Sequence, residues 1–390
     1  MACAPVSAEI PGGALRGGNS TTRSLAPQCL YKDTLEWTSS PNGAVLLNGN
    51  AFHIKGISWF GIEKGEEMLH GLNKRPMGDI LDFVKTKFNV IRVPYSVKFA
   101  LSDPLTKRPD RYIVGFGLED KTSFEILDIF VAECGKRGIF IMLDQHDIVG
   151  EKAELWYEGV YTEEDSIRAW EVMLGRYVNS YNVFAADLRN EPHGLASWGE
   201  SNPLTDYNHY YERLINRLAA KYPDWKGLWL VEGTQYNNEG YEPPVPQWWG
   251  ESRLVYAPHI YGPSVYEHGY MKEPDFPNNL PAVWEKMYGF IIPTLKKAVI
   301  IGEWGGSCIV VQYKLGEWLK EKCMSNNVWW ALNPGSDDTG GILGNDWTSV
   351  DYVKMNLLDN VQPNPTRVQY VTKDQICMDW GAFSNPNCKA

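Results

Sequence analysis

The chain has 390 residues, of which 44% are hydrophobic, and carries a formal net charge of −11 with an isoelectric point near 5.2. This length and hydrophobic content suit one large folded domain with extensions. No apolar run reaches the ~20 residues that a membrane-spanning helix needs. An acidic surface repels phosphate backbones and anionic lipids, so we expect no nucleic-acid or membrane partner, and we expect a monomer.

The two ends of the chain are predicted to differ from its middle. Residues 1–30 are rich in Gly, Ser, Thr and Ala, which predicts a flexible tail. This tail has no apolar segment typical of an intact signal peptide. Residues 31–362 are predicted to form the main domain. Residues 363–390 contain several prolines and are expected to pack on it as a C-terminal extension.

The middle of the chain alternates between strand-like and helix-like segments. A β-hairpin is predicted over residues 44–54, turning at Asn48-Gly49-Asn50. Eight apolar, strand-like runs then follow, at residues 57–59, 90–93, 139–143, 183–188, 228–231, 254–257, 299–301 and 328–332. Helical patterns lie between or after them, at residues 78–88, 123–137, 163–178, 206–221, 280–295, 310–324 and 350–358.

Runs that are apolar on both faces, each followed by a helix, indicate a parallel sheet covered by helices. Eight such units over roughly 300 residues favour a closed α/β barrel, the (β/α)8 or TIM barrel, over an open sheet. The segment between the fifth and sixth runs is rich in Pro and Trp, so a helix there is doubtful. No Gly-x-Gly-x-x-Gly or P-loop pattern follows the first run, which weakens a nucleotide-binding interpretation.

Seven cysteines are present, at positions 3, 29, 134, 308, 323, 377 and 388. None forms a Cys-x-x-Cys pair, so the sequence suggests neither a zinc site nor redox chemistry. The odd number leaves at least one thiol unpaired. If the protein is exported, Cys377 and Cys388 could pair across a short loop, and Cys308 and Cys323 are a weaker candidate pair.

Polar side chains gather where the predicted strands end. In a parallel barrel, the carboxyl ends of all strands meet at one rim and point into a shared cleft. Six of the eight strands end in such residues: Arg92; Asp144-Gln145-His146-Asp147; Arg189-Asn190-Glu191-Pro192-His193; His259-Ile260-Tyr261; Gly302-Glu303-Trp304-Gly305; and Trp329-Trp330. A single polar strand end could be a helix cap or a salt bridge, but six together indicate a site.

Two of these residues are carboxylates on opposite sides of the predicted rim. Glu191 follows the fourth strand and Glu303 the seventh. Hydrolysis of a glycosidic bond passes through an oxocarbenium-like transition state and uses a carboxylic acid on one side and a carboxylate on the other. The pair therefore predicts glycoside hydrolysis in which one carboxylate attacks the anomeric carbon and the other protonates the leaving oxygen.

At this point the sequence resembles glycoside hydrolase family 5, and within it the bacterial endoglucanase branch called subfamily 1. The resemblance runs from about Ile57 to Val353. The segments that carry it are 56–61, 70–72, 91–96, Asn190-Glu191-Pro192, Glu303 and the long segment 333–343. Asn-Glu-Pro alone occurs by chance, but the ordered set does not.

The resemblance implies a role for each rim residue. Glu191 would be the acid and base, and Glu303 would be the nucleophile. Arg92 and Tyr261 would donate to the nucleophile, and Asn190 would bind the 2-hydroxyl of the sugar. His146 and His259 would complete the cleft, while Trp330 and Trp59 would stack on sugar rings. Structural alternatives remain for three of them, because Arg92 could anchor the rim, His259 could be structural and Trp59 could lie in the core.

The implied activity is that of a secreted, retaining endo-β-1,4-glucanase acting on a β-glucan polysaccharide. A β-mannanase or other β-glycanase on the same fold remains an alternative, as does a barrel that binds carbohydrate without cutting it. This chemistry needs no cofactor. Asp337, Asp338 and Asp346 lack the spacing of an EF-hand loop, so we expect no metal.

Overall fold

The fold is that of a computed structural model, which describes residues 27–102, 109, 112–150, 153–237 and 251–390. At its centre lies a parallel sheet of ten short segments. They are β5 (Lys55–Ser58), β6 (Val90–Ser96), β7 (Phe140–Asp147), β8 (Val183–Asp187), β9 (Leu228–Val231), β10 (Leu254–Tyr256), β11 (His259–Tyr261), β12 (Ala298–Val299), β13 (Ile301–Gly305) and β14 (Asn327–Trp329).

The ten segments make eight strands, because the sixth and seventh strands are each interrupted. Only Ala257 and Pro258 separate β10 from β11, and only Ile300 separates β12 from β13. β10 pairs with β9 and β12, β11 pairs with β13, and β14 returns to pair with β5, all in parallel. The sheet therefore closes into the predicted eight-stranded barrel.

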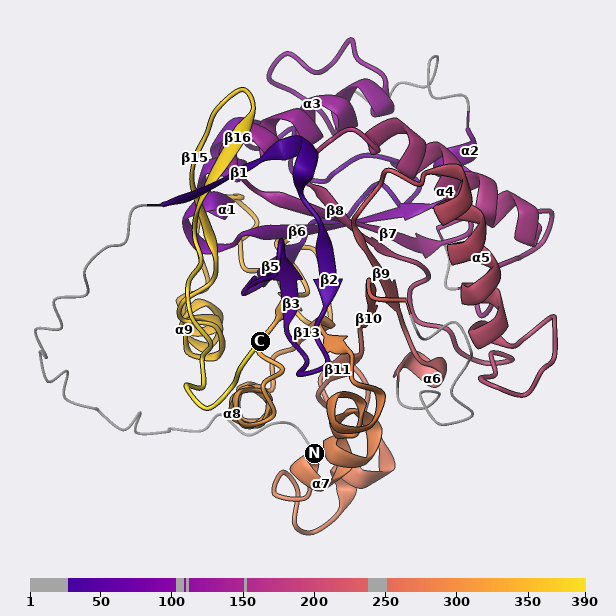
Figure 1. The fold of residues 1–390 in the computed structure, drawn as a ribbon, viewed down its shortest axis with the longest axis vertical. Coiled ribbons are helices and arrows are strands. Elements are labelled where there is room, and N and C mark those ends of the chain that lie inside the picture. The colour runs from indigo at the N-terminus through magenta and orange to yellow at the C-terminus, as the bar shows by residue number, and fades with distance from the viewer. Residues whose placement is uncertain (1–26, 103–108, 110–111, 151–152, 238–250) are drawn as a thin grey trace, which may run out of the picture.

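Helices encircle the barrel (Figure 1). The long ones are α1 (Met77–Lys87), α3 (Ser123–Arg137), α4 (Glu163–Tyr177), α5 (Tyr207–Lys221), α8 (Ile309–Glu321) and α9 (Tyr352–Val361), and the short ones are α2 (Val97–Leu101) and α6 (Thr234–Asn237). The predicted helix over 280–295 is instead α7 (Leu280–Trp284) followed by two π-helical turns, Glu285–Gly289 and Ile291–Leu295. As expected, the described part of the connection before β10 has little helix: α6 is a single turn in which Gln235 and Tyr236 leave the helical conformation.

Side chains inside the barrel follow rows of every second strand residue, as the two-residue period of a strand requires. The rows are Val90 and Arg92 on β6; Phe140, Met142 and Asp144 on β7; Ala185 and Asp187 on β8; and Leu228, Leu230 and Glu232 along β9. Each row is apolar at the amino ends of the strands and polar at their carboxyl ends. We call these ends the amino rim and the carboxyl rim.

A small sheet plugs the amino rim and lies across the barrel in Figure 1. It consists of β2 (Trp37–Ser39), β3 (Val45–Leu47) and β4 (Asn50–Ala51). The predicted hairpin is the β3–β4 pair. Its two-residue turn has positive φ at Asn48 (47°) and Gly49 (79°), which suits a type I′ turn.

The C-terminal segment forms a second small sheet with the start of the described chain. β15 (Arg367–Val371) and β16 (Gln375–Asp379) are antiparallel, and β1 (Gln28–Tyr31) pairs with β16. Residues 1–26 of the expected flexible tail lie outside the described residues. The tail's last residues, from Gln28, form β1.

The structure corrects the predicted cysteine pairs. Between described residues the disulfides are Cys29–Cys377, whose residues lie opposite each other in the β1–β16 register, and Cys323–Cys388. Cys377 is therefore not bonded to Cys388. Cys308 is disulfide-bonded too, but not to Cys323, while Cys134 is a buried free thiol.

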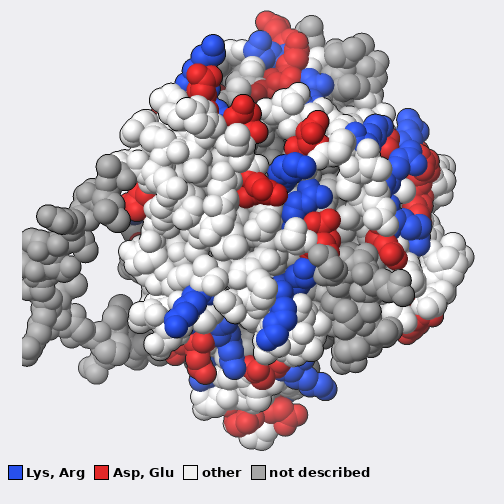
Figure 2. Space-filling model, in the orientation of Figure 1, with Lys and Arg blue, Asp and Glu red and all other residues white. Residues whose placement is uncertain are grey.

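On the face shown in Figure 2, acidic and basic side chains are interspersed, without one broad basic patch. Within the described residues, each helix is too short or too polar to cross a membrane.

Candidate active site

Arg92 lies at the centre of the carboxyl rim and contacts several of its polar side chains. It is fully buried on β6, where its Nε donates to Asp187 (2.8 Å) and its Nη1 donates to Glu303. Its Nη2 donates to Asn190 Oδ1 (3.0 Å) and lies 3.1 Å from Asp144. Burial opposes the guanidinium charge, but the carboxylates of Asp144 and Glu303 outweigh burial and raise the pKa of Arg92 well above its usual value. The rim is therefore organised around one permanent cation.

Glu303 points into the rim because β13 contains a bulge. Ile301 pairs with Asn327 and Trp304 with Trp329, so between these two pairs β13 contains one residue more than β14. The extra residue reverses the alternation and turns the side chain of Glu303 inward, as bulges next to active sites commonly do. Glu303 is 4% exposed, and its carboxylate accepts from Arg92 and from the Tyr261 hydroxyl (2.6 Å).

Tyr261 keeps its proton for this bond. Burial and the neighbouring carboxylate of Glu303 raise the pKa of the Tyr261 phenol well above its usual value. Two donors therefore hold Glu303, one charged and one neutral.

Glu191 faces Glu303 across the rim, with His259 between them. Nδ1 of His259 lies 3.1 Å from Oε1 of Glu191 and 3.6 Å from Oε2 of Glu303. One oxygen of each carboxylate and a nitrogen of His259 lie within 4.8 Å of one another. Two residues separated by 112 positions in sequence are thus brought face to face.

Asn190 and His146 lie beside this pair. The Asn190 amide nitrogen is 3.5 Å from Nε2 of His146, and Nδ1 of His146 is 2.7 Å from Oδ2 of Asp144. Burial opposes a charge on His146, but Asp144 outweighs it and raises the pKa of this histidine. Asp144 therefore orients the ring and leaves Nε2 toward the cleft.

Trp330 closes the other side of the rim in an aromatic stack. Its ring is nearly parallel to Phe60 (5.4 Å between centroids, 9°) and to His146 (5.3 Å, 11°). Its indole N–H donates to Ser336 Oγ (3.1 Å). These contacts fix the orientation of the ring.

Trp59 does not belong to the rim, which corrects our expectation of a second stacking platform. The side chain is fully buried, donates its indole N–H to His70 O (2.9 Å) and packs edge-on against Phe130. On this strand Trp59 faces the outer helices and its neighbour Phe60 faces inward. A buried ring offers no face to a sugar, so the core alternative applies.

Glu191 borders a cavity of about 760 Å³ that extends from the rim. Its walls are strongly aromatic: they include Tyr236, Tyr261, Tyr266, Tyr270, Trp284 and Tyr288. Aromatic rings and hydrogen-bonding groups in one open cavity suit a polar ligand with C–H faces.

Two groups of side chains at the rim have the spacing of metal ligands. They are Asp187, Glu232 and His259, and Glu191, His259 and Glu303. Arg92 already lies among these carboxylates. Burial lowers the pKa of His259, but Glu232 and Glu303 outweigh it and raise that pKa well above its usual value. A protonated histidine has no lone pair for a cation, so the arrangement suits proton transfer better than metal binding.

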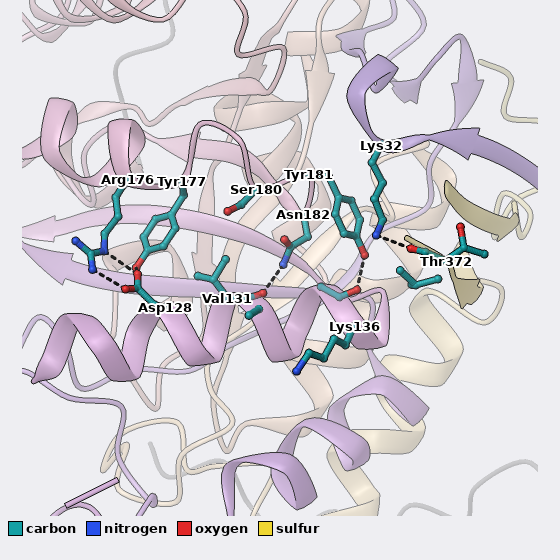
Figure 3. Close-up of a pocket in the computed structure, with 13 residues that line it drawn as sticks. Lys32, Asp128, Val131, Lys136, Arg176, Tyr177, Ser180, Tyr181, Asn182 and Thr372 are labelled. Carbon is teal, nitrogen blue, oxygen red and sulfur yellow. Dashed lines mark hydrogen bonds and ion pairs between the residues drawn. The ribbon is translucent and has the colours of Figure 1, made fainter. Parts of the chain in front are cut away.

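A second hollow, of about 540 Å³, lies near the amino rim between α3, the segment before β8 and the β15–β16 turn (Figure 3). Its polar groups already bond one another. Arg176 and Tyr177 both bond Asp128, and Lys32 donates to Thr372 O (2.7 Å). None of the predicted site residues lines this hollow. Residues at this end of a barrel serve stability, so we do not place the active site there.

The model of the cellulase family, glycosyl hydrolase family 5, matches residues 45–336. The chain belongs to glycosyl hydrolase family 5. Its relatives include an endoglucanase of Paenibacillus polymyxa, 37% identical over 82% of this chain and 85% of that protein. The major extracellular endoglucanase of Xanthomonas campestris pv. campestris is 36% identical over 80% of this chain and 68% of that protein.

Solved structures of family 5 enzymes agree with the fold. An endocellulase of the archaeon Pyrococcus horikoshii superimposes with a TM-score of 0.76 at 30% identity, covering 85% of this chain and all of that one. The catalytic domain of the Xanthomonas campestris enzyme gives 0.73 at 34% identity over 81% and 96% of the two chains. A further structure holds a variant of the Pyrococcus horikoshii endocellulase with cellotetraose, at a TM-score of 0.74 and 32% identity over 84% and 98% of the chains.

Two buried carboxylates at the rim were not among the site residues predicted from the sequence. Asp187 bonds Arg92, and Glu232 lies 2.8 Å from the backbone nitrogen of Glu191. Both are completely buried at the ends of inward rows. The sequence does contain a pattern that could have identified them: each is a charged residue two positions after an inward-facing apolar residue of a buried strand.

Proposed function

We propose that this family 5 glycoside hydrolase is a retaining endo-β-1,4-glucanase that cuts internal bonds of a β-glucan chain. The observation that carries the proposal is the approach of Glu191 and Glu303, with one oxygen of each within 4.8 Å. Retaining glycosidases place their two carboxyl groups ~5–5.5 Å apart, whereas inverting enzymes leave ~6.5–9.5 Å for a water molecule. The short separation supports the retaining reaction.

In the first step, a carboxylate oxygen of Glu303 attacks the anomeric carbon while the glycosidic C–O bond breaks. Glu191 gives its proton to the departing oxygen. The Arg92 guanidinium and the Tyr261 hydroxyl both donate to Glu303 and so hold its carboxylate in position for attack. In the second step, Glu191 takes a proton from water, the water oxygen attacks the same carbon, and Glu303 leaves.

The remaining rim residues would hold the sugar. Asn190 is fixed by Arg92 through its side-chain oxygen, which leaves its amide nitrogen for the 2-hydroxyl. His146, held by Asp144, offers Nε2 to a hydroxyl, and Trp330 offers a ring face. A sugar's C–H face packs well on such a ring.

A β-1,4-glucan is the substrate we favour, because relatives over most of the chain are named endoglucanases and one related structure holds cellotetraose. We also propose that the protein is secreted. One relative is named an extracellular enzyme, and disulfide bonds such as Cys29–Cys377 persist in oxidising compartments.

The test compares soluble substituted cellulose, β-mannan and laminarin at equal mass concentration, with Glu303→Gln as the inactive control. We expect rapid loss of viscosity on the cellulose derivative and much slower cleavage of the others. Preferred cleavage of mannan would move the substrate assignment to β-mannanase. Binding without cleavage of all three would leave a carbohydrate-binding barrel. The anomer first released from cellohexaose, read by NMR, tests retention.

A further inference from the structure

Glu232 is a completely buried carboxylate at the end of β9. It ends the inward row formed by Leu228 and Leu230, so its side chain points to the barrel axis below the rim. Its Oε2 accepts the backbone N–H of Glu191 at 2.8 Å.

That backbone N–H belongs to a strained residue. Glu191 has a φ of 44°, in the left-handed region that residues with side chains rarely adopt. Such a conformation is unfavourable and persists only where surrounding contacts impose it. A hydrogen bond from an amide to a buried carboxylate is stronger than a neutral one, so Glu232 supplies such a contact.

The second oxygen of Glu232 reaches His259. Oε1 lies 3.2 Å from Nε2 of that ring, an ion-pair contact without the alignment of a hydrogen bond, while Nδ1 of the same ring is hydrogen-bonded to the Glu191 carboxylate at 3.1 Å. Glu232 therefore touches Glu191 twice, directly at its backbone and through His259 at its side chain. The three residues form a closed circuit.

Neutralising Arg92 is a weaker explanation for Glu232. Nη2 of Arg92 does donate to Oε1 of Glu232, but at 3.5 Å, longer than the contacts that Arg92 makes with Asp187 (2.8 Å) and Asp144 (3.1 Å). Arg92 makes closer contacts with other carboxylates, whereas the backbone N–H of Glu191 donates to Glu232 at 2.8 Å.

From this circuit we propose that Glu232 is a positioning residue for proton transfer: it fixes the backbone of Glu191 and orients His259 against the Glu191 carboxyl group. The inference rests on the acid and base role proposed above for Glu191. Glu232 itself does not touch the substrate and exchanges no proton with it.

The charge on the circuit follows from its surroundings. His259 faces the carboxylates of Glu191, Glu303 and Glu232, with Asp187, Asp144 and Arg92 farther into the barrel. The Tyr288 hydroxyl donates to the backbone carbonyl of His259 (3.3 Å). Removing the Glu232 charge removes one negative charge from the group, which makes every remaining proton easier to lose.

The experiment measures kcat/KM of Glu232→Gln on two substrates, a 2,4-dinitrophenyl β-cellobioside and cellotetraose. The activated phenol leaves without a proton, whereas the sugar needs one. We expect a loss of about 100-fold on cellotetraose and of less than about 5-fold on the aryl glycoside. The basic limb of the pH profile should shift to lower pH by about one unit.

The control is Asp206→Asn, which removes another completely buried carboxylate. Asp206 caps α5 and bonds the backbone nitrogens of Gly199 and Ser201, away from the rim. It should lower the melting temperature without changing the pH profile or the ratio between the two substrates. Equal losses on both substrates in Glu232→Gln, with the basic limb in place, would overturn the positioning role.

Two further variants keep the outcomes separate. If Glu191→Ala shows no dependence on the leaving group, the proposed function fails. If it shows that dependence and Glu232→Gln does not, only the inference about Glu232 fails. Should Glu232→Gln not fold, Glu232→Asp retains the charge but is one methylene shorter. It should then slow cellotetraose selectively while leaving the basic limb unchanged, and equal slowing of both substrates would overturn the inference.

Discussion

The two rims of the barrel receive the same inward rows of side chains and use them differently. At the amino rim, Trp37 of the β2–β4 plug packs against Phe52, Phe140 and Phe184, with centroids 4.8, 5.3 and 4.6 Å away. At the carboxyl rim, the rows end in charged groups around Arg92. The amino rim buries apolar area, whereas the carboxyl rim holds charges and a strained backbone at Glu191.

Histidines report the same contrast. His53, near the amino rim, is 6% exposed, and burial lowers its pKa to about 4. At the carboxyl rim His259 is also buried and His146 is half-buried, yet the carboxylates beside them raise their pKa values. Burial alone therefore does not decide the charge of a histidine; its charged neighbours do. Stability and chemistry should then respond to different substitutions.

The largest expected effect is on activity alone. Glu303→Gln removes the attacking oxygen but keeps the side chain's size, so kcat should fall by at least about 10⁴-fold. The melting temperature should change by only a few degrees, and binding of cellotetraose, measured by calorimetry, should persist. Substantial turnover in this variant would refute the role of Glu303.

The matching change at the amino rim should affect stability alone. Trp37→Ala empties a buried aromatic site and should lower the free energy of unfolding by about 3–5 kcal/mol in urea titrations. The exposed Tyr352→Ala should cost less than about 0.5 kcal/mol. If Trp37→Ala lowered kcat per folded molecule more than a few-fold, the two rims would not be independent.

The difference between the two rims could be predicted only partly from the sequence. Apolar runs located all eight strands, because residues buried on both faces leave a clear pattern. The bulge that turns Glu303 inward and the break at Pro258 depend on pairing with neighbouring strands. The Cys29–Cys377 bond joins positions 348 residues apart through the β1–β16 register, for which no local pattern exists.

Phase along the strand also explains the error at Trp59. Both Trp59 and Phe60 are aromatic, and composition could not tell which of them faces the rim. Strand alternation places Ser58 and Phe60 on the inward side with Trp330, and Ile57 and Trp59 on the outward side. Counting residues from the inward Gly56 would have favoured Phe60.

A pH experiment should separate the rims next. Because the pKa of His53 is about 4 when folded and 6.5 when unfolded, the unfolded state binds more protons between these values. The stability from neutral His53 is present above pH 6.5 and lost as the pH falls toward 4, by about 3 kcal/mol. His53→Gln should flatten this part of the curve of unfolding free energy against pH. Identical curves for both proteins would contradict the assignment.

The smallest expected effect concerns the support of Trp330. Ser336→Ala removes the oxygen that accepts the indole N–H of Trp330. The hydrogen bond that holds the ring in its orientation, worth about 1 kcal/mol, is then lost. KM for cellotetraose should rise about 3- to 10-fold, with kcat nearly unchanged. Thr348→Ala, on the same loop but bonded to Asp346, should leave KM unchanged. Equal KM values for Ser336→Ala and the wild type would contradict stacking by Trp330.

The position of Ala390 decides where a domain fused at this end of the chain would lie. Its backbone carbonyl accepts a hydrogen bond from the side-chain amide of Asn42 in the β2–β3 turn. This turn belongs to the plug, on the side of the barrel away from the rim that holds Glu191 and Glu303. A module fused after Ala390 would therefore trail behind the enzyme, and the open cleft could still settle along a polymer chain.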